Sequence, residues 1–322
     1  MLRLAALAGG VGAARMLCGL SDVMAPTDMT VVVNTGDDLT IHGLRVCPDI
    51  DTVTYALAGA IDAERAWGLT GETWAVMAAL DRYPDVAPPG SRAGHSWFRL
   101  GDRDLATHLY RTQRLAEEGS LSDVTAEIAR AWDVQVRLIP MSDQRVETRV
   151  TVPGPEPETS VEIGFQDYFV RLGHAVPVQA VRFAGIDEAE PAAGVLESIG
   201  SADQVLICPS NPIVSIGPIL AVPGVGEAVA QRRRDVVAVS PIIAGTAVRG
   251  PADRLMTELG HEASVAGVAH LYTPFASTLV VDEADADMAD AVGAEGMRCI
   301  VTPTLMTGPA EASALARAVL RR

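Results

Sequence analysis

The opening of the chain alternates between strand and helix patterns, and this alternation limits the possible folds more than any other feature. Residues 2–7 form a short apolar run, residues 8–12 (AGGVG) predict a glycine turn, and residues 13–20 predict a helix that starts with small side chains. A second apolar strand is predicted at 30–34, so the chain begins as a βαβ unit. Such a unit requires two parallel strands joined by a helical crossover.

Short apolar strands then recur along the chain, separated by helical patterns. They are expected at 134–140, 204–208, 236–239, 278–281 and 298–301. The predicted fold class is α/β, a Rossmann-like and mostly parallel sheet with helices on both faces. We expect a single domain over 1–322, with a helical insertion at about 64–133. An arm at about 141–190 is expected to add a small accessory β layer, so that both segments cover the active edge of the sheet.

The charge of the chain argues against nucleic acid and acidic membranes as partners. The 322 residues carry 41 acidic and 25 basic side chains, a formal net charge of -16. No apolar run approaches the roughly 20 residues that span a bilayer, and the first residues do not read as a signal peptide. The four cysteines are scattered and predict neither disulfides nor a zinc site. We therefore expect a cytoplasmic protein with small-molecule partners.

The chain contains no lysine, so all 25 basic residues are arginine. This excludes a Walker-A lysine, a Schiff base and a lysine general base. A bound phosphate must therefore be held by backbone N–H groups, arginine or metal. The turn GGVGAA at 9–14 offers such N–H groups, because it joins a strand to a helix N-terminus. Gly10 and Gly12 are the candidates. The match to GxGxxG is partial, and the glycines would also suit close strand–helix packing alone.

Four aspartates follow the second strand within fifteen positions. Asn34-Thr35-Gly36 ends the strand, and the acids are Asp37, Asp38, Asp49 and Asp51. Acids beyond the carboxyl end of a parallel strand are well placed to hold a hard cation, although a solvated acidic loop would have the same pattern. Asp51 is also expected to be the N-cap of a helix at 52–57.

Two further strands end in proline-rich loops that contain serine. These are PSNPIVSIGP at 209–218 and SPIIAG at 240–245, and we expect both loops to line one cleft.

The segment FRLGDRD at 98–104 predicts either a helix cap with surface ion pairs or an arginine presented to a ligand. The six histidines have no HxxxH or HExxH spacing, so zinc is not expected. The acidic run at 282–290 is expected to be a solvated helix face.

Taken together, six motifs in order along the chain resemble the CofD/FbiA family. They are GGVGAAR at 9–15, NTGDD at 34–38, CPDIDT at 47–52, LGDRDLATH at 100–108, PSNPIVSIGPI at 209–219 and SPIIAG at 240–245. This family contains the phospholactate and phosphoenolpyruvate transferases of coenzyme F-420 biosynthesis. The resemblance implies a Rossmann-like homodimer that joins the deazaflavin Fo to the phosphoryl group of an enolpyruvyl- or lactyl-diphosphoguanosine, with GMP leaving. The composition of the chain, which is rich in alanine and contains arginine but no lysine, resembles that of actinobacterial members of the family. This resemblance favours the enolpyruvyl donor.

The resemblance also implies roles for particular residues. Asp51 and Arg99 match positions that contact the deazaflavin. We predict Mg²⁺ between Asp37 and Asp51, which would also be the catalytic residues, with Asp38 and Asp49 as outer or alternate ligands. Gly10 and Gly12 would hold the diphosphate, and Ser210 and Asn211 would help to hold the guanosine nucleotide. The cysteine of CPDIDT departs from the serine that other members often carry, and we read this difference as neutral.

Two other classes of function remain as alternatives. A non-catalytic regulator that binds nucleotide sugars would share this sheet, but the motif LGDRDLATH favours the enzyme. A nicotinamide oxidoreductase ranks third because the glycine spacing is irregular and the second strand lacks the usual ribose-binding context.

Overall fold

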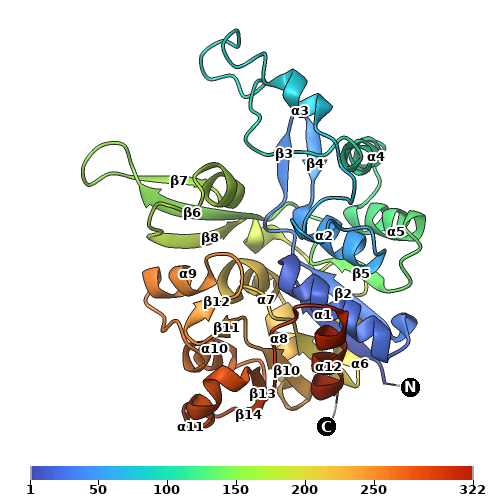
Figure 1. The fold of residues 1–322 in the computed structure, drawn as a ribbon, viewed down its shortest axis with the longest axis vertical. Helices are drawn as coiled ribbons and strands as arrows, with labels where there is room; N and C mark the ends of the chain where they lie inside the picture. The colour runs from blue at the N-terminus through green and yellow to red at the C-terminus, as the bar shows by residue number, and fades with distance from the viewer. Residues whose placement is uncertain (1, 321–322) are drawn as a thin grey trace.

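A seven-stranded parallel sheet forms the centre of the molecule in the computed structural model, which describes residues 2–320 (Figure 1). The strand order is β14-β13-β10-β9-β1-β2-β5, which confirms the predicted Rossmann-like α/β class. The strands are β1 (Leu4–Ala8), β2 (Met29–Val33), β5 (Arg137–Pro140), β9 (Gln204–Ile207), β10 (Val236–Val239), β13 (Thr278–Val281) and β14 (Arg298–Val301).

Both faces of the sheet are covered, which explains why its strands are apolar throughout instead of alternating. Along β1, Ala5 and Leu7 join one buried cluster, whereas Leu4, Ala6 and Ala8 join another. The first cluster includes side chains of α6 (Val195–Ser201), α8 (Val225–Gln231) and α10 (Val265–Tyr272). The second includes side chains of α1 (Gly10–Val23), α2 (Pro48–Leu57), α5 (Leu121–Ala131) and α12 (Pro309–Leu320). Figure 1 shows α12, near the end of the chain, beside α1.

The direction in which strands are added to the sheet reverses at β1. From β1 the chain adds β2 and then β5 on one side, and it later returns to add β9, β10, β13 and β14 on the other. In register, Leu7 pairs with Val32 on one side and with Ile207 on the other. The gap between the carboxyl ends of β1 and β9 is therefore a topological switch point, where open α/β sheets bind ligands.

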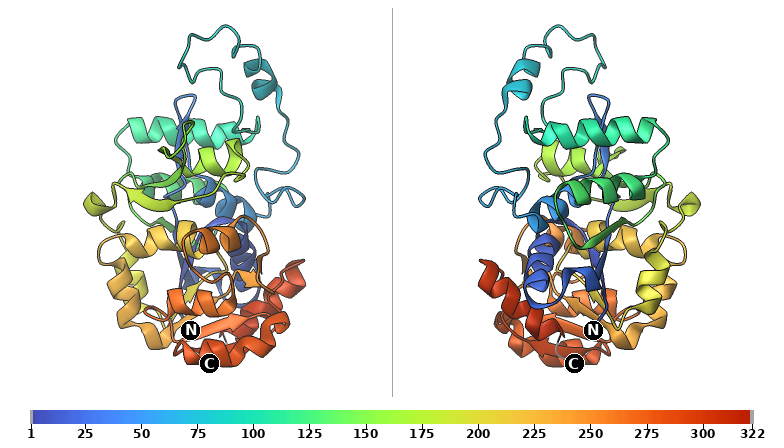
Figure 2. Two further views of the ribbon diagram at one scale, coloured as in Figure 1. Left: turned by 90° about the vertical axis from the view of Figure 1, so that its left-hand side faces the viewer. Right: turned by 90° about the vertical axis from the view of Figure 1, so that its right-hand side faces the viewer.

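A segment between β2 and β5 extends beyond the carboxyl edge of the sheet. It contains the hairpin β3 (Leu39–Ile41) and β4 (Leu44–Val46), followed by α3 (Ala75–Leu80) and α4 (Asp104–Ala116). Ile41, Val46, Met77 and Leu100 give this segment a small apolar core of its own. In both views of Figure 2, α3 and its flanking loops lie farthest from the sheet.

An antiparallel sheet follows β5 and lies beside the same edge (Figure 1). Its order is β7-β6-β8, with β6 (Glu147–Pro153), β7 (Ser160–Gly164) and β8 (Ala180–Ala184). The predicted accessory β layer is thus present. The remaining elements are short: η1 (Pro26–Asp28), η2 (Asp167–Arg171), η3 (Ile186–Glu188), η4 (Pro212–Ile216), α7 (Gly217–Ala221), η5 (Arg233–Asp235), β11 (Ile242–Ile243), β12 (Thr246–Ala247), α9 (Ala252–Glu258), η6 (Glu283–Met288) and α11 (Ala289–Ala294).

Two local predictions were wrong. Helix α2 begins at Pro48 with Cys47 as its N-cap, so Asp51 is not an N-cap and lies in the first turn. The reason is that proline at the first helical position has a φ already suited to a helix. The acidic run is not a uniformly solvated face either, because Asp285 is buried and its carboxylate accepts the backbone N–H of Ala244 at 3.0 Å.

Within residues 2–320, no single helix is long and apolar enough to cross a membrane. One bent pair, Pro212–Ala221 with Val225–Gln231 at 95°, meets the length and composition test only when both parts are combined. Ile216, Ile219 and Val229 of this pair are fully buried in the core.

Candidate active site

A cavity of about 700 Å³ opens at the carboxyl ends of the strands, at the switch point between β1 and β9. The residues predicted from the sequence to form a site lie far apart along the chain but line this one cavity: Gly10, Gly12, Asp37, Asp51, Arg99, Ser210 and Asn211. Asp49 lines it as well. The two proline-rich loops both contribute to its wall, through Pro209 and Pro241 among others.

The glycine turn brings the N-terminus of α1 against the loop that follows β9. The helix begins at Gly10, earlier than predicted, and its N-cap residue Gly9 has no side chain with which to cap the first turn. A side chain at position 12 would not fit, because an added Cβ would lie 2.2 Å from the carbonyl oxygen of Pro209. The backbone N–H of Gly9 also reaches Ser210 Oγ, at 3.4 Å. Gly12 therefore permits the close approach that puts a positive helix end at the switch point.

Asp49 and Asp37 form a pair of buried carboxylates beside this helix end. Asp49 Oδ1 accepts the N–H of Gly10 at 2.9 Å, and its Oδ2 accepts the side-chain amide of Asn34 at 2.9 Å. Burial raises the pKa of Asp49 to about 6, against the lowering effect of these two hydrogen bonds. Burial, and then the charge of Asp49, raise the pKa of Asp37 well above its ordinary value. Asp37 Oδ1 is buried and has no hydrogen-bond partner within the part of the chain that the structure describes, so the charge of the pair is incompletely compensated.

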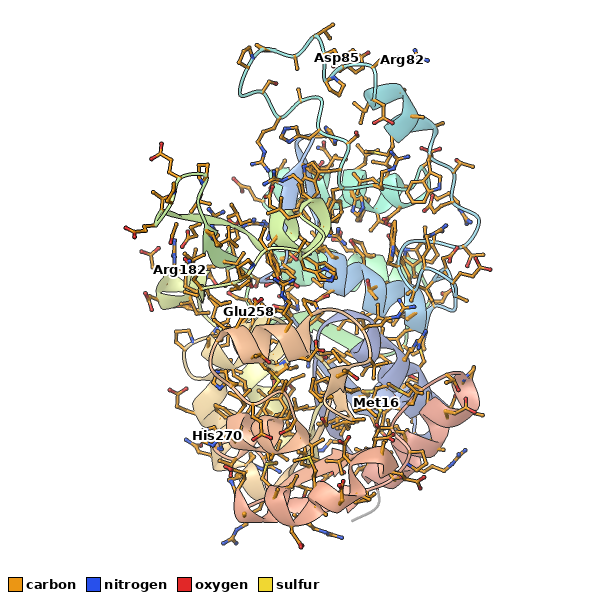
Figure 3. The ribbon with its side chains drawn as sticks, turned by 60° about the vertical axis from the view of Figure 1, so that its left-hand side comes forward. Met16, Arg82, Asp85, Arg182, Glu258 and His270 are labelled. Carbon is orange, nitrogen blue, oxygen red and sulfur yellow. The ribbon has the colours of Figure 1, made fainter. Side chains whose placement is uncertain are left out.

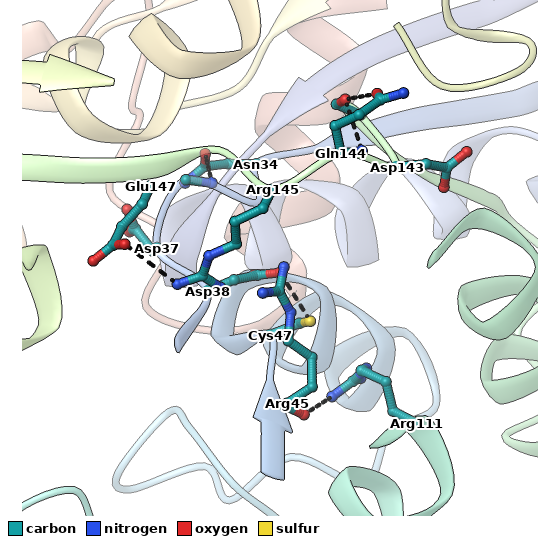
Figure 4. A network of polar contacts seen from close by, with 12 residues as sticks. Asn34, Asp37, Asp38, Arg45, Cys47, Arg111, Asp143, Gln144, Arg145 and Glu147 are labelled. Atoms are coloured by element: carbon teal, nitrogen blue, oxygen red, sulfur yellow. Dashed lines mark hydrogen bonds and ion pairs between the residues drawn. The ribbon is translucent and has the colours of Figure 1, made fainter. Parts of the chain in front are cut away.

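Asp38 turns away from the cavity toward the β3–β4 hairpin (Figure 4). Its Oδ2 accepts hydrogen bonds from Arg45 Nη2 at 2.9 Å and from the Cys47 thiol at 3.0 Å. Burial raises the pKa of Asp38, and Arg45 and Cys47 act in the opposite direction. Asp38 therefore anchors the hairpin behind the acidic pair.

Asp51 is held by an arginine that sequence reasoning did not identify. Arg111 of α4 lies 60 positions away, and its two terminal nitrogens donate to both carboxylate oxygens of Asp51, with Nη1 to Oδ2 at 3.1 Å. The side chain of Arg111 is completely buried. Burial alone would lower its pKa, but the charge of Asp51 and that of the Cys47 thiolate form keep it above the ordinary arginine value.

Two more residues of α4 complete a polar cluster around Asp51. His108 Nδ1 lies 3.7 Å from Asp51 Oδ2, and its Nε2 lies 3.2 Å from Asp104 Oδ2. Asp104 also accepts the hydroxyl of Tyr55 at 2.5 Å. Although burial raises the pKa of Asp104, the hydrogen bonds and charges of His108, Tyr55 and Arg111 together lower it more, so that the net change is downward.

Asp51, Asp104 and His108 could together hold a metal ion, because one ligand atom from each lies within 4.8 Å of the others. Asp37 is not part of this three-residue group. The sequence analysis considered His108 only for zinc and did not identify it as a neighbour of Asp51 and Asp104. The signal was present in the sequence, since Asp104 and His108 are four residues apart in a predicted helix and therefore share a face.

Part of the cavity wall is aromatic and cationic, with Trp67, Trp97, Phe98, Arg65 and Arg99 among its lining residues, and Trp74 packs behind the two arginines. The exposed fraction of the Arg99 side chain is 44%, and Arg99 contacts Asp81 at 3.6 Å and lies over the ring of Trp74 at 6.0 Å. Arg65 lies over both Trp67 and Trp74, at 5.6 and 5.4 Å. This wall suits a planar ligand, because rings and guanidinium groups stack on such a molecule.

The loop after β9 is stiffened by its own side chains. Asn211 Oδ1 accepts the N–H groups of Ile213 at 2.9 Å and of Val214 at 3.3 Å, so this amide caps η4. Its Nδ2 is the part of the amide left to contact a ligand. Ser210 lines the cavity next to it, and its Oγ lies 3.4 Å from the backbone N of Gly9, just before α1.

Comparisons with known proteins agree with the residue pattern. A family model described as 2-phospho-L-lactate transferase CofD matches residues 4–302. A phosphoenolpyruvate transferase of Kitasatospora aureofaciens is 47% identical over 321 residues, covering 99% of this chain and 97% of that protein. The same name belongs to relatives from Streptomyces griseus, 46% identical with 99% and 98% covered, and from Mycolicibacterium smegmatis, 40% identical with 99% and 98% covered.

Among solved structures, a UPF0052-family protein from Bacillus halodurans has a similar fold. Its TM-score is 0.60 at 17% identity, and the match covers 99% of each chain. At this identity the likeness concerns the fold alone. The sequence relatives carry the assignment, and they confirm the family resemblance noted above: the chain belongs to the CofD family of 2-phospho-L-lactate transferases.

Proposed function

We propose that this chain transfers a phosphoenolpyruvyl group from a guanosine diphospho-donor to the ribityl hydroxyl of the deazaflavin Fo, releasing GMP and giving dehydro coenzyme F-420-0. The relatives described above are named phosphoenolpyruvate transferases, which favours this donor over its 2-phospho-L-lactyl analogue. The observation that carries the proposal is the cavity itself. A helix N-terminus, a buried acidic pair and an aromatic wall with arginines all face one space.

The two substrates are assigned to opposite ends of the cavity. The N-terminus of α1, with Gly10 and Gly12, would receive the diphosphate, because exposed N–H groups and the helix dipole favour anions. Ser210 and Asn211 lie next to this helix end and would contact the nucleotide. Arg99 and the tryptophan-lined wall would receive the deazaflavin ring, which is planar. Asp51 lines the same cavity, and we assign it to the space between the two substrates.

The acidic residues fit a hard divalent cation. Among residues 2–320, buried Asp37 Oδ1 has no hydrogen-bond partner, so it could serve as a ligand atom for a cation. Asp51 can offer a further oxygen, because the two hydrogen bonds from Arg111 use about half of the four or so lone-pair sites of a carboxylate. We assign Mg²⁺ to Asp37 and Asp51, with Asp49 as the adjacent alternate ligand. When bound, it would neutralise charge on the diphosphate and on the transferred phosphoryl group.

The reaction asks the protein mainly for positioning. The hydroxyl oxygen of Fo attacks the phosphorus atom that bears the enolpyruvyl group, and the bond from this phosphorus to the bridging oxygen breaks, so that GMP leaves with the bonding electrons. The hydroxyl proton is lost during the attack, and Asp51 is the carboxylate placed to accept a hydrogen bond from it. The α1 N–H groups stabilise charge on the diphosphate oxygens. No covalent intermediate on the enzyme is required.

The test is a reaction of purified protein with Mg²⁺, Fo and the guanosine donor. We expect GMP release and a product whose mass differs by two hydrogens between the enolpyruvyl and lactyl donors. Absence of GMP above a protein-free control, while both substrates bind, would refute the transferase. A regulator that binds nucleotide sugars, the alternative expected from sequence, would leave Fo fluorescence unchanged on titration. The proposal keeps the cytoplasm as compartment and a homodimer as assembly, which light scattering of the purified protein can check.

A further inference from the structure

We propose that Arg111 is a positioning residue for this transfer, one that acts on Fo only through the carboxylate of Asp51. The proposal rests on the function proposed above. Arg111 belongs to the third turn of α4, so it comes from the insertion and not from the sheet. It does not line the cavity, whereas Asp51 does. Any effect of Arg111 on a bound substrate must therefore pass through the group that it holds.

The guanidinium group is fixed from several sides. Nη2 and Nη1 bind the two oxygens of Asp51, and Nη1 also approaches the carbonyl of Arg45 and His108 Nδ1, both at 3.4 Å. Figure 4 shows Arg111 reaching the backbone carbonyl of Arg45, in the middle of β4. A planar fork that binds both oxygens stops the carboxylate from rotating. The remaining lone pairs of Asp51 are thereby held in one direction, toward the cavity.

Arg111 also supplies the positive charge that pairs with Asp51 beside other buried acids. Asp37 and Asp49 line the same cavity and are buried, and neither forms an ion pair within residues 2–320. Arg45 is paired with Asp38, at 2.9 Å. Arg111 is thus the buried guanidinium that pairs with Asp51, while Asp37, Asp49 and Asp104 also border the cavity. A lysine would keep the charge, but it could not hold both oxygens in a fixed plane.

A purely structural role would make a different prediction, because a broken buried ion pair destabilises the fold. The test therefore uses Arg111→Lys, which preserves the charge, and it scales every rate to the folded fraction measured by circular dichroism. Arg114→Lys is the matched control. Arg114 lies one turn further along α4 and pairs with Glu117 and Glu127, at 3.1 and 2.9 Å, outside the cavity.

We expect Arg111→Lys to lower kcat roughly 10- to 100-fold, the range seen when the residue that orients a site ligand is changed. KM for the guanosine donor should stay within about twofold, and Arg114→Lys should behave as wild type. A wild-type kcat per folded molecule in Arg111→Lys would overturn the proposal, and so would a loss explained entirely by unfolding.

A double-mutant cycle with Asp51→Asn isolates the route of action. Fo affinity, measured by fluorescence titration, should weaken in Arg111→Lys but should not weaken further when the change is made in the Asp51→Asn background. Equal losses in both backgrounds would show that Arg111 acts independently of Asp51. This readout does not need turnover. If the wild-type protein binds Fo but releases no GMP, the proposed transferase function is refuted, and the cycle can still test the role of Arg111. If it neither binds Fo nor releases GMP, both proposals are refuted.

Discussion

Asp49 binds the backbone N–H of Gly10 at 2.9 Å, so a carboxylate of the chain itself occupies the first amide of helix α1. This is the amide predicted to meet the diphosphate of the donor. An incoming phosphate oxygen and Asp49 Oδ1 therefore compete for one N–H. We expect Asp49 to leave this position when the donor binds. Because Asp49 is buried, its protonation state should change with pH in an accessible range.

The raised pKa of Asp49 predicts a pH dependence of stability. The folded chain holds this proton with a pKa of about 6, against about 3.9 in the unfolded chain. Because the folded state binds the proton more tightly, the stabilisation is present at low pH and is lost as the pH rises from about 4 through about 6. Between pH 5 and pH 8, wild type should lose on the order of 1 to 2 kcal/mol relative to Asp49→Asn. Urea unfolding of both proteins at the two pH values measures this, and a constant difference would contradict it.

Magnesium should stabilise the folded chain, and more strongly at high pH. Protons compete with a cation for the carboxylates of Asp37 and Asp49, because the pKa values of both are raised. At about 100 times its Kd, the ion would add about 2.7 kcal/mol to the free energy of unfolding. The melting temperature should therefore rise on addition of Mg²⁺ at pH 8 and rise less at pH 5, with EDTA reversing the effect.

The Asp37→Asn variant should lose most of this magnesium effect. The matched control is Asp85→Asn, because Asp85 is an exposed acid at the outer end of the insertion (Figure 3). An equal magnesium response in wild type and Asp37→Asn would remove Asp37 from the metal site.

Substitution of Gly12 tests the close contact between α1 and the loop after β9. In Gly12→Ala, the new Cβ would lie 2.2 Å from Pro209 O, and a backbone atom cannot move aside without shifting the loop. We expect a loss of about 1 to 3 kcal/mol in stability and weaker binding of GDP, measured by calorimetry. Gly200→Ala is the control, because its Cβ would meet nothing within 4 Å in the short helix α6. Unchanged GDP binding in Gly12→Ala would contradict the assignment of this turn to phosphate.

The sequence predicted the parts of the site that depend on local patterns. Apolar strands of four or five residues, the glycine turn and the acids after β2 all follow from neighbouring residues, and the parallel topology then brings them to one edge. The start of α2 at Pro48 was not predicted, because the prediction used Asp51 as the N-cap and not the proline, which is itself favoured at the first helical position.

The partners of Asp51 could not be predicted in the same way. Arg111 is 60 positions away on an inserted helix, and no periodicity within α4 indicates which strand end that helix will face. An arginine in a helix is ordinarily a solvent-facing residue. Only the packing of the insertion against α2 and the hairpin makes Arg111 a buried ion-pair partner, and only this packing brings His108 beside Asp51.

Arg99 provides the test of the wall assigned to the deazaflavin. Its guanidinium lies 6.0 Å from the ring centre of Trp74 and 3.6 Å from Asp81, with 44% of the side chain exposed, so much of it is available to a ligand in the cavity. Arg99→Ala removes a cation that can stack on a planar ring, an interaction worth about 1 to 2 kcal/mol when partly desolvated. We expect Fo affinity, followed by its fluorescence, to fall roughly 5- to 30-fold.

Arg82→Ala is the matched control for this substitution. Arg82 is an exposed arginine of the same insertion, located near its outer end and away from the cavity (Figure 3). Its loss changes the net charge of the chain by the same amount, so a general electrostatic effect on Fo would appear in both variants. If Arg82→Ala weakens Fo binding as much as Arg99→Ala does, Arg99 does not contact the deazaflavin. A fall confined to Arg99→Ala, with GDP affinity unchanged, places Fo at this wall and the nucleotide elsewhere in the cavity.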